Sequence, residues 1–129
     1  MSAPQLSDAR LTILVVDDFD DTRLLLRTFL ERKGFRVVEA QNGLEAVAMA
    51  RNEDPALIIM DMQMPYLDGL AATRKIRETK VSGTLPIVAV SAYGADQFRD
   101  QAIAAGCDEY VSTPFEPTEL EQIIRTLVH

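Results

Sequence analysis

The 129-residue chain is poor in the side chains that most often carry catalysis or bind transition metals. It contains one histidine, His129, and one cysteine, Cys107. A histidine-dependent catalytic triad, a cluster of histidine or cysteine metal ligands and an internal disulfide are therefore excluded. A single cysteine fits a reducing compartment, so we expect a cytoplasmic protein in which Cys107 is a small, buried apolar residue rather than a redox centre.

Positive charge and long apolar runs are also scarce. Lys and Arg number 13 against 20 Asp and Glu, so the net charge is −7, which argues against nucleic acid as a direct partner. No apolar run approaches the ~18–20 residues that cross a bilayer, and the first ten residues contain no apolar signal region, so no membrane association is expected. The length and the 47% share of hydrophobic residues suit one globular domain.

What the chain does contain is a regular alternation of short apolar runs and segments with helical periodicity. Strands are predicted at 11–16, 35–40, 56–60, 86–90 and 108–112. Helices are predicted at 22–33, from Asn42 to Arg51, from the turn at 64–69 to Glu78, from Asp96 to Gly106, and from Pro117 onward. Asp68 and Gly69 are expected to form the turn and cap of the third helix. The last helix carries one apolar stripe of Leu120, Ile123, Ile124 and Leu127. This alternation predicts an α/β, doubly wound (βα)5, flavodoxin-like fold with a parallel sheet in the order 2-1-3-4-5. We expect one domain at 11–128 after a polar tail at 1–10.

Polar side chains stand at the ends of these apolar runs. Asp17 and Asp18 follow the first run, and Asp61, Ser91 and Thr113 end the third, fourth and fifth. The carboxyl ends of parallel strands share one edge of the sheet, where two carboxylates about 4 Å apart repel by roughly 4 kcal/mol. A cation or a raised pKa must offset that repulsion. Carboxylate and hydroxyl oxygens suit Mg²⁺, whereas solvent exposure or helix capping would explain one such acid more readily than three.

The sequence resembles the receiver domain of two-component response regulators over about residues 11–128. The resemblance rests on I-L-V-V-D-D at 13–18, L-I-I-M-D-M-Q-M-P-Y-L-D-G at 57–69, V-A-V-S-A at 88–92 and A-A-G-C-D-E-Y-V-S-T-P-F at 104–115. It implies Mg²⁺-dependent transfer of a phosphoryl group to an aspartate from the phosphohistidine of a histidine kinase or phosphotransfer protein. It also implies a downstream protein target, reached through the face of the fourth helix, fifth strand and fifth helix, and a monomer or weak dimer.

The resemblance assigns a role to each acid at the predicted edge. Asp61 matches the phosphoacceptor and Asp18 a direct magnesium ligand, while Asp17 matches an acid that holds the ion through water or shapes the site. The backbone carbonyl of Gln63 matches the third protein ligand. The chemistry is consistent with these roles, because a carboxylate can form an acyl phosphate and a bridging magnesium ion neutralises charge as it develops.

Two further side chains are assigned to the response to phosphorylation. Ser91 matches the hydroxyl that closes on the phosphoryl group, and Tyr110 matches an aromatic switch; the family also suggests a cis peptide bond before Pro114. One position departs from the family pattern, because Thr113 stands where a lysine usually precedes the proline. Threonine donates one hydrogen bond and has no charge, so we expect the metal to carry more of the neutralisation and both phosphorylation and switching to be altered.

The missing lysine leaves a second function open, a receiver-like binding module that works without phosphorylation. Thr113 favours that alternative, whereas the carboxylates at the predicted edge and Ser91 oppose it. Arg23 and Lys75 lie near site elements in the sequence and are the candidates to replace the missing cation. A stand-alone regulator and a domain of a longer protein, such as a hybrid kinase, both fit the sequence.

An enzyme of another class is the third possibility. D-F-D-D-T at 18–22 fits the signature of haloacid-dehalogenase-type phosphohydrolases, with Asp18 as nucleophile, Asp20 as general acid and Ser91 as the second motif. That chemistry also requires a lysine and another acidic pair, and it leaves Asp17 unexplained. A flavin-binding protein is disfavoured because no Ser/Thr/Gly-rich phosphate loop follows the first strand. We therefore expect no enzyme activity beyond the chain's own phosphorylation and dephosphorylation.

Overall fold

The computed structural model describes residues 10–64, 67–79, 85–92 and 97–128. The strands are β1 (Thr12–Val16), β2 (Arg36–Ala40), β3 (Leu57–Asp61), β4 (Ile87–Ala92) and β5 (Glu109–Thr113). The helices are α2 (Asp20–Arg32), α3 (Gly43–Asn52), α4 (Gly69–Thr79), α5 (Gln97–Ala105) and α6 (Pro117–Leu127). Within the described residues the predicted alternation of strands and helices is confirmed.

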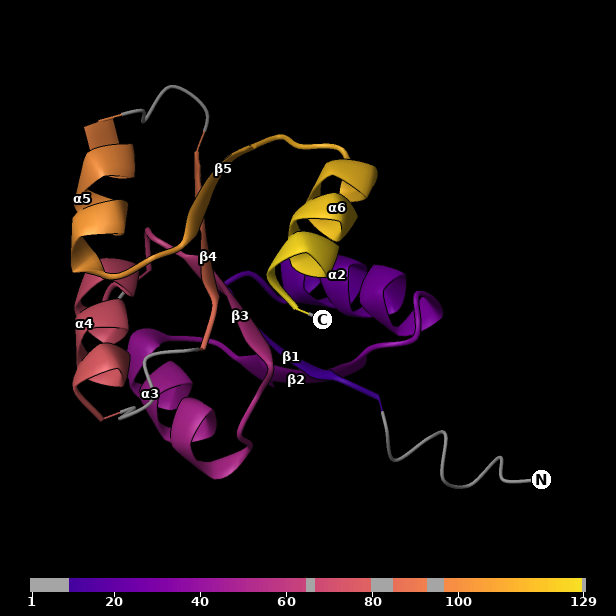
Figure 1. The fold of residues 1–129 in the computed structure, drawn as a ribbon, viewed down its shortest axis with the longest axis horizontal. Helices are drawn as coiled ribbons and strands as arrows, with labels where there is room; N and C mark the ends of the chain where they lie inside the picture. Colours follow the sequence, from indigo (N-terminus) through magenta and orange to yellow (C-terminus); the bar gives the residue numbers. More distant parts are fainter. Residues whose placement is uncertain (1–9, 65–66, 80–84, 93–96, 129) are drawn as a thin grey trace.

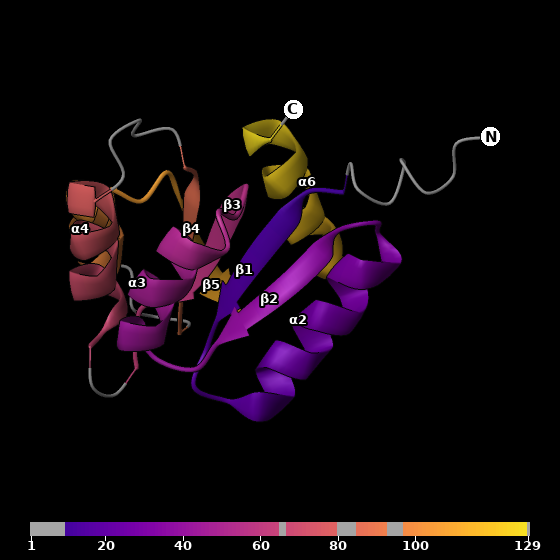
Figure 2. The same ribbon diagram turned by 90° about the horizontal axis from the view of Figure 1, so that it is seen from below.

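The strands form one parallel sheet in the order β2-β1-β3-β4-β5, which confirms the predicted topology. Helices α2 and α6 cover one face, and α3, α4 and α5 cover the other (Figure 1, Figure 2). Alternate residues of a strand therefore enter different cores: Leu14 packs with Ile76 of α4, whereas Ile13 packs with Leu30 and Ile124. Burial on both faces explains why the strands read as continuous apolar runs.

Local contacts explain where several elements begin. The Asn42 side chain accepts a hydrogen bond of 2.9 Å from the Glu45 N–H, so the predicted cap of α3 is confirmed. Asp68 caps α4 in the same way, by accepting 2.8 Å from the Ala71 N–H. The next residue, Gly69, allows a close approach, because a Cβ there would lie 2.4 Å from the Asp61 carbonyl oxygen. The start of α4 is thereby packed against the end of β3.

Element boundaries differ from the predicted ones by one or two residues. α2 begins at Asp20 rather than at 22, because the Arg23 N–H already donates 3.1 Å to the Phe19 carbonyl. β3 includes Asp61, and the ladder continues beyond it, where the Met62 N–H donates 2.9 Å to the Val90 carbonyl. β4 and β5 likewise end at Ala92 and Thr113. The predicted helix start at Asp96 and most of the predicted tail lie outside the described residues.

Cys107 is buried, as predicted, under α4. Its Sγ lies 3.7 Å from the Thr73 hydroxyl, and burial raises the pKa of the thiol. The peptide bond between Thr113 and Pro114 is cis, as the resemblance suggests. None of the helices in the described ranges has the length and apolar composition needed to span a bilayer.

Candidate functional site

The strand ends bring three carboxylates together at one edge of the sheet. Asp17 and Asp18 follow β1, and Asp61 ends the neighbouring strand β3. One carboxylate oxygen from each of the three lies within 4.8 Å of the other two. The predicted convergence of these side chains is therefore observed, and the cluster has the size and donor type of a site for a hard cation.

Tight turns of the backbone orient two of the carboxylates. Asp17 Oδ1 accepts a hydrogen bond of 2.8 Å from the Phe19 N–H. Asp61 Oδ1 accepts one of 2.9 Å from the Gln63 N–H. Each aspartate thus bonds to the backbone two residues ahead, a turn that its short side chain favours. These bonds fix the direction of both carboxylates at the point where the strands end.

The proximity of three acids and partial burial change the pKa values of the site. Burial is the largest effect on Asp61, with further contributions from Asp17 and Asp18, and together they raise its pKa to about 7 despite the opposing hydrogen bond from Gln63. Burial also raises the pKa of Asp17, and the charge of Asp18 adds to that effect. The carboxyl cluster therefore favours either a bound proton or a bound cation.

The carboxylates open into a pocket of about 400 Å³. Its lining residues are Asp17, Asp18, Phe19, Thr22, Asp61, Gln63, Val90, Ser91 and Thr113. None of these described lining residues is basic. Phe19 and Thr22 were not predicted to belong to the site, although their position directly after the acidic pair is a signal that could have identified them.

The basic residues suggested as replacements for the missing lysine do not fill its place. Arg23 binds on the outer side of the loop: it donates 2.7 Å to the Asp17 carbonyl and 3.0 Å to the Glu39 carboxylate. It also pairs with Asp20. Lys75 is exposed on α4 and does not line the pocket. Arg23 therefore stabilises the backbone after β1 without lining the pocket. The sequence did not indicate this role.

The geometry also bears on the phosphohydrolase alternative. That alternative needs Asp20 beside the nucleophile as a general acid. The Asp20 side chain is 85% exposed, forms an ion pair with Arg23 and does not line the pocket. The described site therefore lacks the acid that a hydrolase would use.

Two hydroxyl groups lie across the pocket from the acids. Ser91 is 1% exposed, and among the described residues its Oγ has no hydrogen-bond partner. The Thr113 hydroxyl donates 3.2 Å to the Ser91 carbonyl, so it is held by the neighbouring strand. Among the described residues the Ser91 hydroxyl is thus buried and unpaired, whereas the Thr113 hydroxyl already has a partner.

Tyr110 lies on β5 with its side chain turned inward. It is 7% exposed and belongs to the core between the sheet and helices α3, α4 and α5. The guanidinium carbon of Arg99, on α5, lies 5.9 Å from the centre of its ring. The ring that the resemblance matched to an aromatic switch is therefore buried in this structure.

Known proteins share both the sequence pattern and the fold. The sequence model of one protein family, the response regulator receiver domain, matches residues 13–125. The transcriptional regulatory protein ResD of Bacillus subtilis is 40% identical over 90% of this chain and 47% of its own length, so the chain spans about half of that relative.

Solved structures give the same result. The receiver domain of the sensor histidine kinase PA1611 from Pseudomonas aeruginosa, solved with magnesium in its active-site cleft, has a TM-score of 0.84 and 32% identity, and covers 92% of this chain and 98% of its own. The chemotaxis protein CheY4 of Vibrio cholerae has a TM-score of 0.86 and 25% identity, with coverages of 93% and 100%. Both similarities extend over nearly the whole chain.

Proposed function

This chain belongs to the response regulator receiver domain family of two-component systems, and we propose that it accepts a phosphoryl group on Asp61. The observation that carries the proposal is the position of the Asp61 carboxylate, which lies within 4.8 Å of oxygens from Asp17 and Asp18 beside an open pocket. One Asp61 oxygen is held by the Gln63 N–H, which leaves the other for attack on phosphorus. The proposed domain occupies 11–128, with 1–10 as a tail.

The donor set fits Mg²⁺ as the cofactor. Burial, with a further contribution from the charges of Asp17 and Asp18, raises the pKa of Asp61, and none of the described residues that line the pocket is basic. We infer that Asp18 and Asp61 bind the ion directly, that Asp17 holds it through water, and that the Gln63 carbonyl is the third protein ligand. When bound, Mg²⁺ would supply positive charge to offset both the carboxylates and the incoming phosphoryl oxygens.

The hydroxyl groups define what the protein offers to the phosphoryl group. The Ser91 Oγ is buried and without a partner in the described part of the chain, so it can donate to a phosphoryl oxygen. Thr113 adds no charge, and its hydroxyl is bound to the Ser91 carbonyl. In the part of the chain that the structure describes, the protein therefore contributes one unpaired side-chain donor and no cation to the pocket, which makes the metal the main source of positive charge.

The family suggests the partners. The proposed phosphoryl donor is the phosphohistidine of a histidine kinase or phosphotransfer protein. The proposed downstream protein target contacts the face of α5, β5 and α6, the elements nearest to Ser91 and Tyr110 along the chain. We propose that the chain works in the cytoplasm and has no substrate of its own beyond this transfer.

Phosphorylation with a small donor tests the proposal. Acetyl phosphate with Mg²⁺ should add one phosphate, detected by intact-protein mass spectrometry, and Asp61→Asn should abolish the addition. Asp100→Asn, which changes an exposed acid on α5, is the matched control and should label normally. Equal labelling of Asp61→Asn and the wild-type protein would contradict the assignment.

One observation favours the alternative of a binding module that works without phosphorylation. Thr113 stands where the family usually has a lysine, brings no charge to the pocket, and its hydroxyl is bound to the Ser91 carbonyl. For such a module, Asp61→Asn should bind the downstream partner as well as the wild-type protein does. For a phosphorylation-dependent receiver, acetyl phosphate should increase partner binding only when Asp61 is present.

A further inference from the structure

The pocket that holds Asp61 adjoins an apolar groove, with which it shares two lining residues, and we propose that a partner protein completes the site from that groove. The partner segment would carry a Lys or Arg next to an apolar side chain. The apolar side chain would fill the groove, and the cation would enter the acidic pocket beside Thr113. The inference rests on the proposed phosphoacceptor function and adds the source of its missing positive charge.

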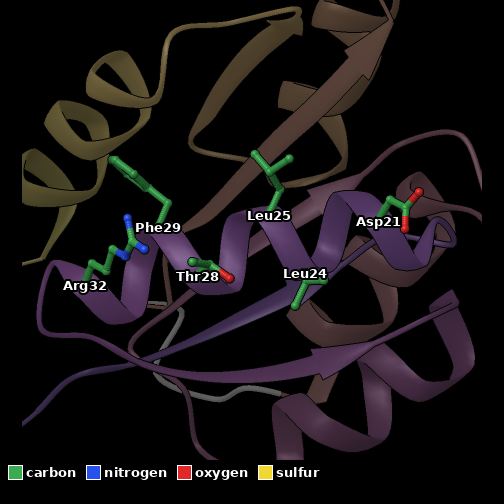
Figure 3. Close-up of a pocket in the computed structure, with 6 residues that line it drawn as sticks. All are labelled: Asp21, Leu24, Leu25, Thr28, Phe29 and Arg32. Carbon is green, nitrogen blue, oxygen red and sulfur yellow. The ribbon is translucent and has the colours of Figure 1, made fainter.

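The groove lies between α2 and the segment that joins β5 to α6. Its volume is about 220 Å³, and its lining residues are Thr22, Leu25, Leu26, Phe29, Thr113, Pro114, Phe115 and Pro117. Figure 3 shows Leu25 and Phe29 leaving α2 on one side, with Phe29 directed towards α6, and Leu24 on the other side. Leu25 is 68% exposed, so the groove has an apolar rim that the described chain does not cover.

The groove and the acidic pocket are neighbours. Thr22 and Thr113 line both of them, one from each wall. Phe19 extends the apolar surface to the mouth of the pocket, where its side chain is 70% exposed. We therefore expect a long side chain that lies in the groove to extend past the two threonines to the carboxylates.

The charges of the pocket specify what should enter it. Three carboxylates line the pocket, and no described lining residue is basic. Arg23, which bonds to the Asp17 carbonyl, does not line the pocket and is engaged by Glu39 and Asp20. The groove is thus apolar where it is entered and acidic at its end, which matches a side chain with an apolar stem and a positive tip.

Phosphorylation of Asp61 would increase the net negative charge of the pocket. With one Mg²⁺ bound, Asp17, Asp18 and the phosphoryl group would carry about four negative charges against two positive ones. The buried Ser91 hydroxyl, which has no partner among the described residues, can donate to the phosphoryl group but brings no charge. A basic side chain from a partner would therefore stabilise the phosphorylated state, so that the partner regulates how long the phosphoryl group remains.

A small cation can replace the partner in a direct test. Beryllofluoride, which binds to carboxylates as a phosphoryl mimic, would be titrated into the full chain with saturating Mg²⁺ and constant ionic strength. We expect n-butylammonium to raise the affinity for beryllofluoride about fivefold, because a charged hydrogen bond is about 1 kcal/mol stronger than a neutral one and that difference corresponds to about a fivefold change in affinity. n-Butanol and tetramethylammonium are the controls, because the first has no charge and the second has no N–H donor, and neither should have this effect.

Substitutions identify the residues through which n-butylammonium raises the affinity for beryllofluoride. Thr113→Lys places a cation in the pocket, so it should bind beryllofluoride more tightly and should not respond to n-butylammonium. Leu25→Ala removes a wall of the groove and should reduce the response, whereas the neighbouring Leu24→Ala should not, although the two leucines are similarly exposed at 68% and 62%. The two exposed leucines provide a test that does not depend on the folding of the Thr113 variant.

The possible failures are distinguishable. If beryllofluoride binds to the wild-type protein but n-butylammonium has no more effect than n-butanol, the completion of the site by a partner cation is wrong while the proposed function stands. An equal loss of response in Leu24→Ala and Leu25→Ala would also overturn the use of the groove. If beryllofluoride binds to neither the wild-type protein nor Thr113→Lys in the presence of Mg²⁺, the proposed phosphoacceptor function itself fails.

Discussion

The affinity for Mg²⁺ should increase about tenfold between pH 6 and pH 8. Burial, together with the nearby charges of Asp17 and Asp18, raises the pKa of Asp61 to about 7, and the proposed metal site requires its ionised form. At pH 6 about one molecule in eleven carries the ionised carboxylate, and at pH 8 about ten in eleven do. The ratio of these populations is about ten, which corresponds to about 1.4 kcal/mol of binding free energy.

The stability of the metal-free protein should change in the opposite direction. The pKa of Asp61 is higher in the folded protein than the ordinary value of 3.8, so the folded state binds more protons than the unfolded state between about pH 4 and pH 7. The free energy of unfolding should therefore fall as the pH rises through this window. Saturating Mg²⁺ should remove that fall, because the ion stabilises the ionised carboxylate.

Isothermal titration calorimetry at pH 6, 7 and 8 measures the affinity, and thermal unfolding with and without Mg²⁺ measures the stability. Asp61→Asn should bind more weakly and show a much flatter pH dependence, whereas Asp100→Asn should behave like the wild-type protein. A wild-type affinity that is the same at pH 6 and pH 8 would refute the reasoning, because it would mean that no carboxyl group of the metal site titrates in this range.

Three other predictions follow from packing and burial. Gly69→Ala should lower the free energy of unfolding by about 1–3 kcal/mol in urea, and should weaken Mg²⁺ binding, because its Cβ would lie 2.4 Å from the Asp61 carbonyl oxygen. Arg23→Gln should lower the free energy of unfolding by about 1–3 kcal/mol, because the Arg23 side chain is only 12% exposed. The control Arg27→Gln should lower it by only about 0–1 kcal/mol, because the Arg27 side chain is 43% exposed. Cys107 should resist iodoacetamide until urea unfolds the protein, because burial raises the pKa of its thiol; rapid labelling of the folded protein would contradict this.

The fold was largely predictable because it depends on a repeated pattern. Continuous apolar runs such as 13–16 and 57–60 indicate strands that are buried on both faces, and their alternation with helices requires parallel pairing. The convergence of Asp17, Asp18 and Asp61 follows from the same rule, because the ends of parallel strands meet at one edge. The boundaries were less predictable, because the hydrogen-bonded ladder extends past the apolar residues into Asp61.

Other features depend on three-dimensional contacts that the sequence pattern does not contain. The Arg23 side chain could have faced the pocket or the solvent. Its bonds to Glu39 and to the Asp17 carbonyl show instead that it is held away from the pocket. The inward position of Tyr110 depends on the space between the sheet and α5. The groove arises from two segments far apart in the chain, 22–29 and 113–117.

The two turns that hold Asp17 and Asp61 bear on which ion the proposed site would select. Each turn uses one carboxylate oxygen to accept a backbone N–H, from Phe19 and from Gln63. A carboxylate with one oxygen fixed by a backbone bond is poorly placed to grip an ion with both oxygens, so Asp61 is predisposed to bind the ion through a single oxygen and Asp17 to accept from a metal-bound water through a single oxygen. Ca²⁺ commonly takes carboxylates through both oxygens and requires six to eight ligands, whereas the smaller Mg²⁺ accepts single oxygens and keeps its waters. The backbone of two short loops would thus discriminate against the larger ion without any side chain dedicated to that task.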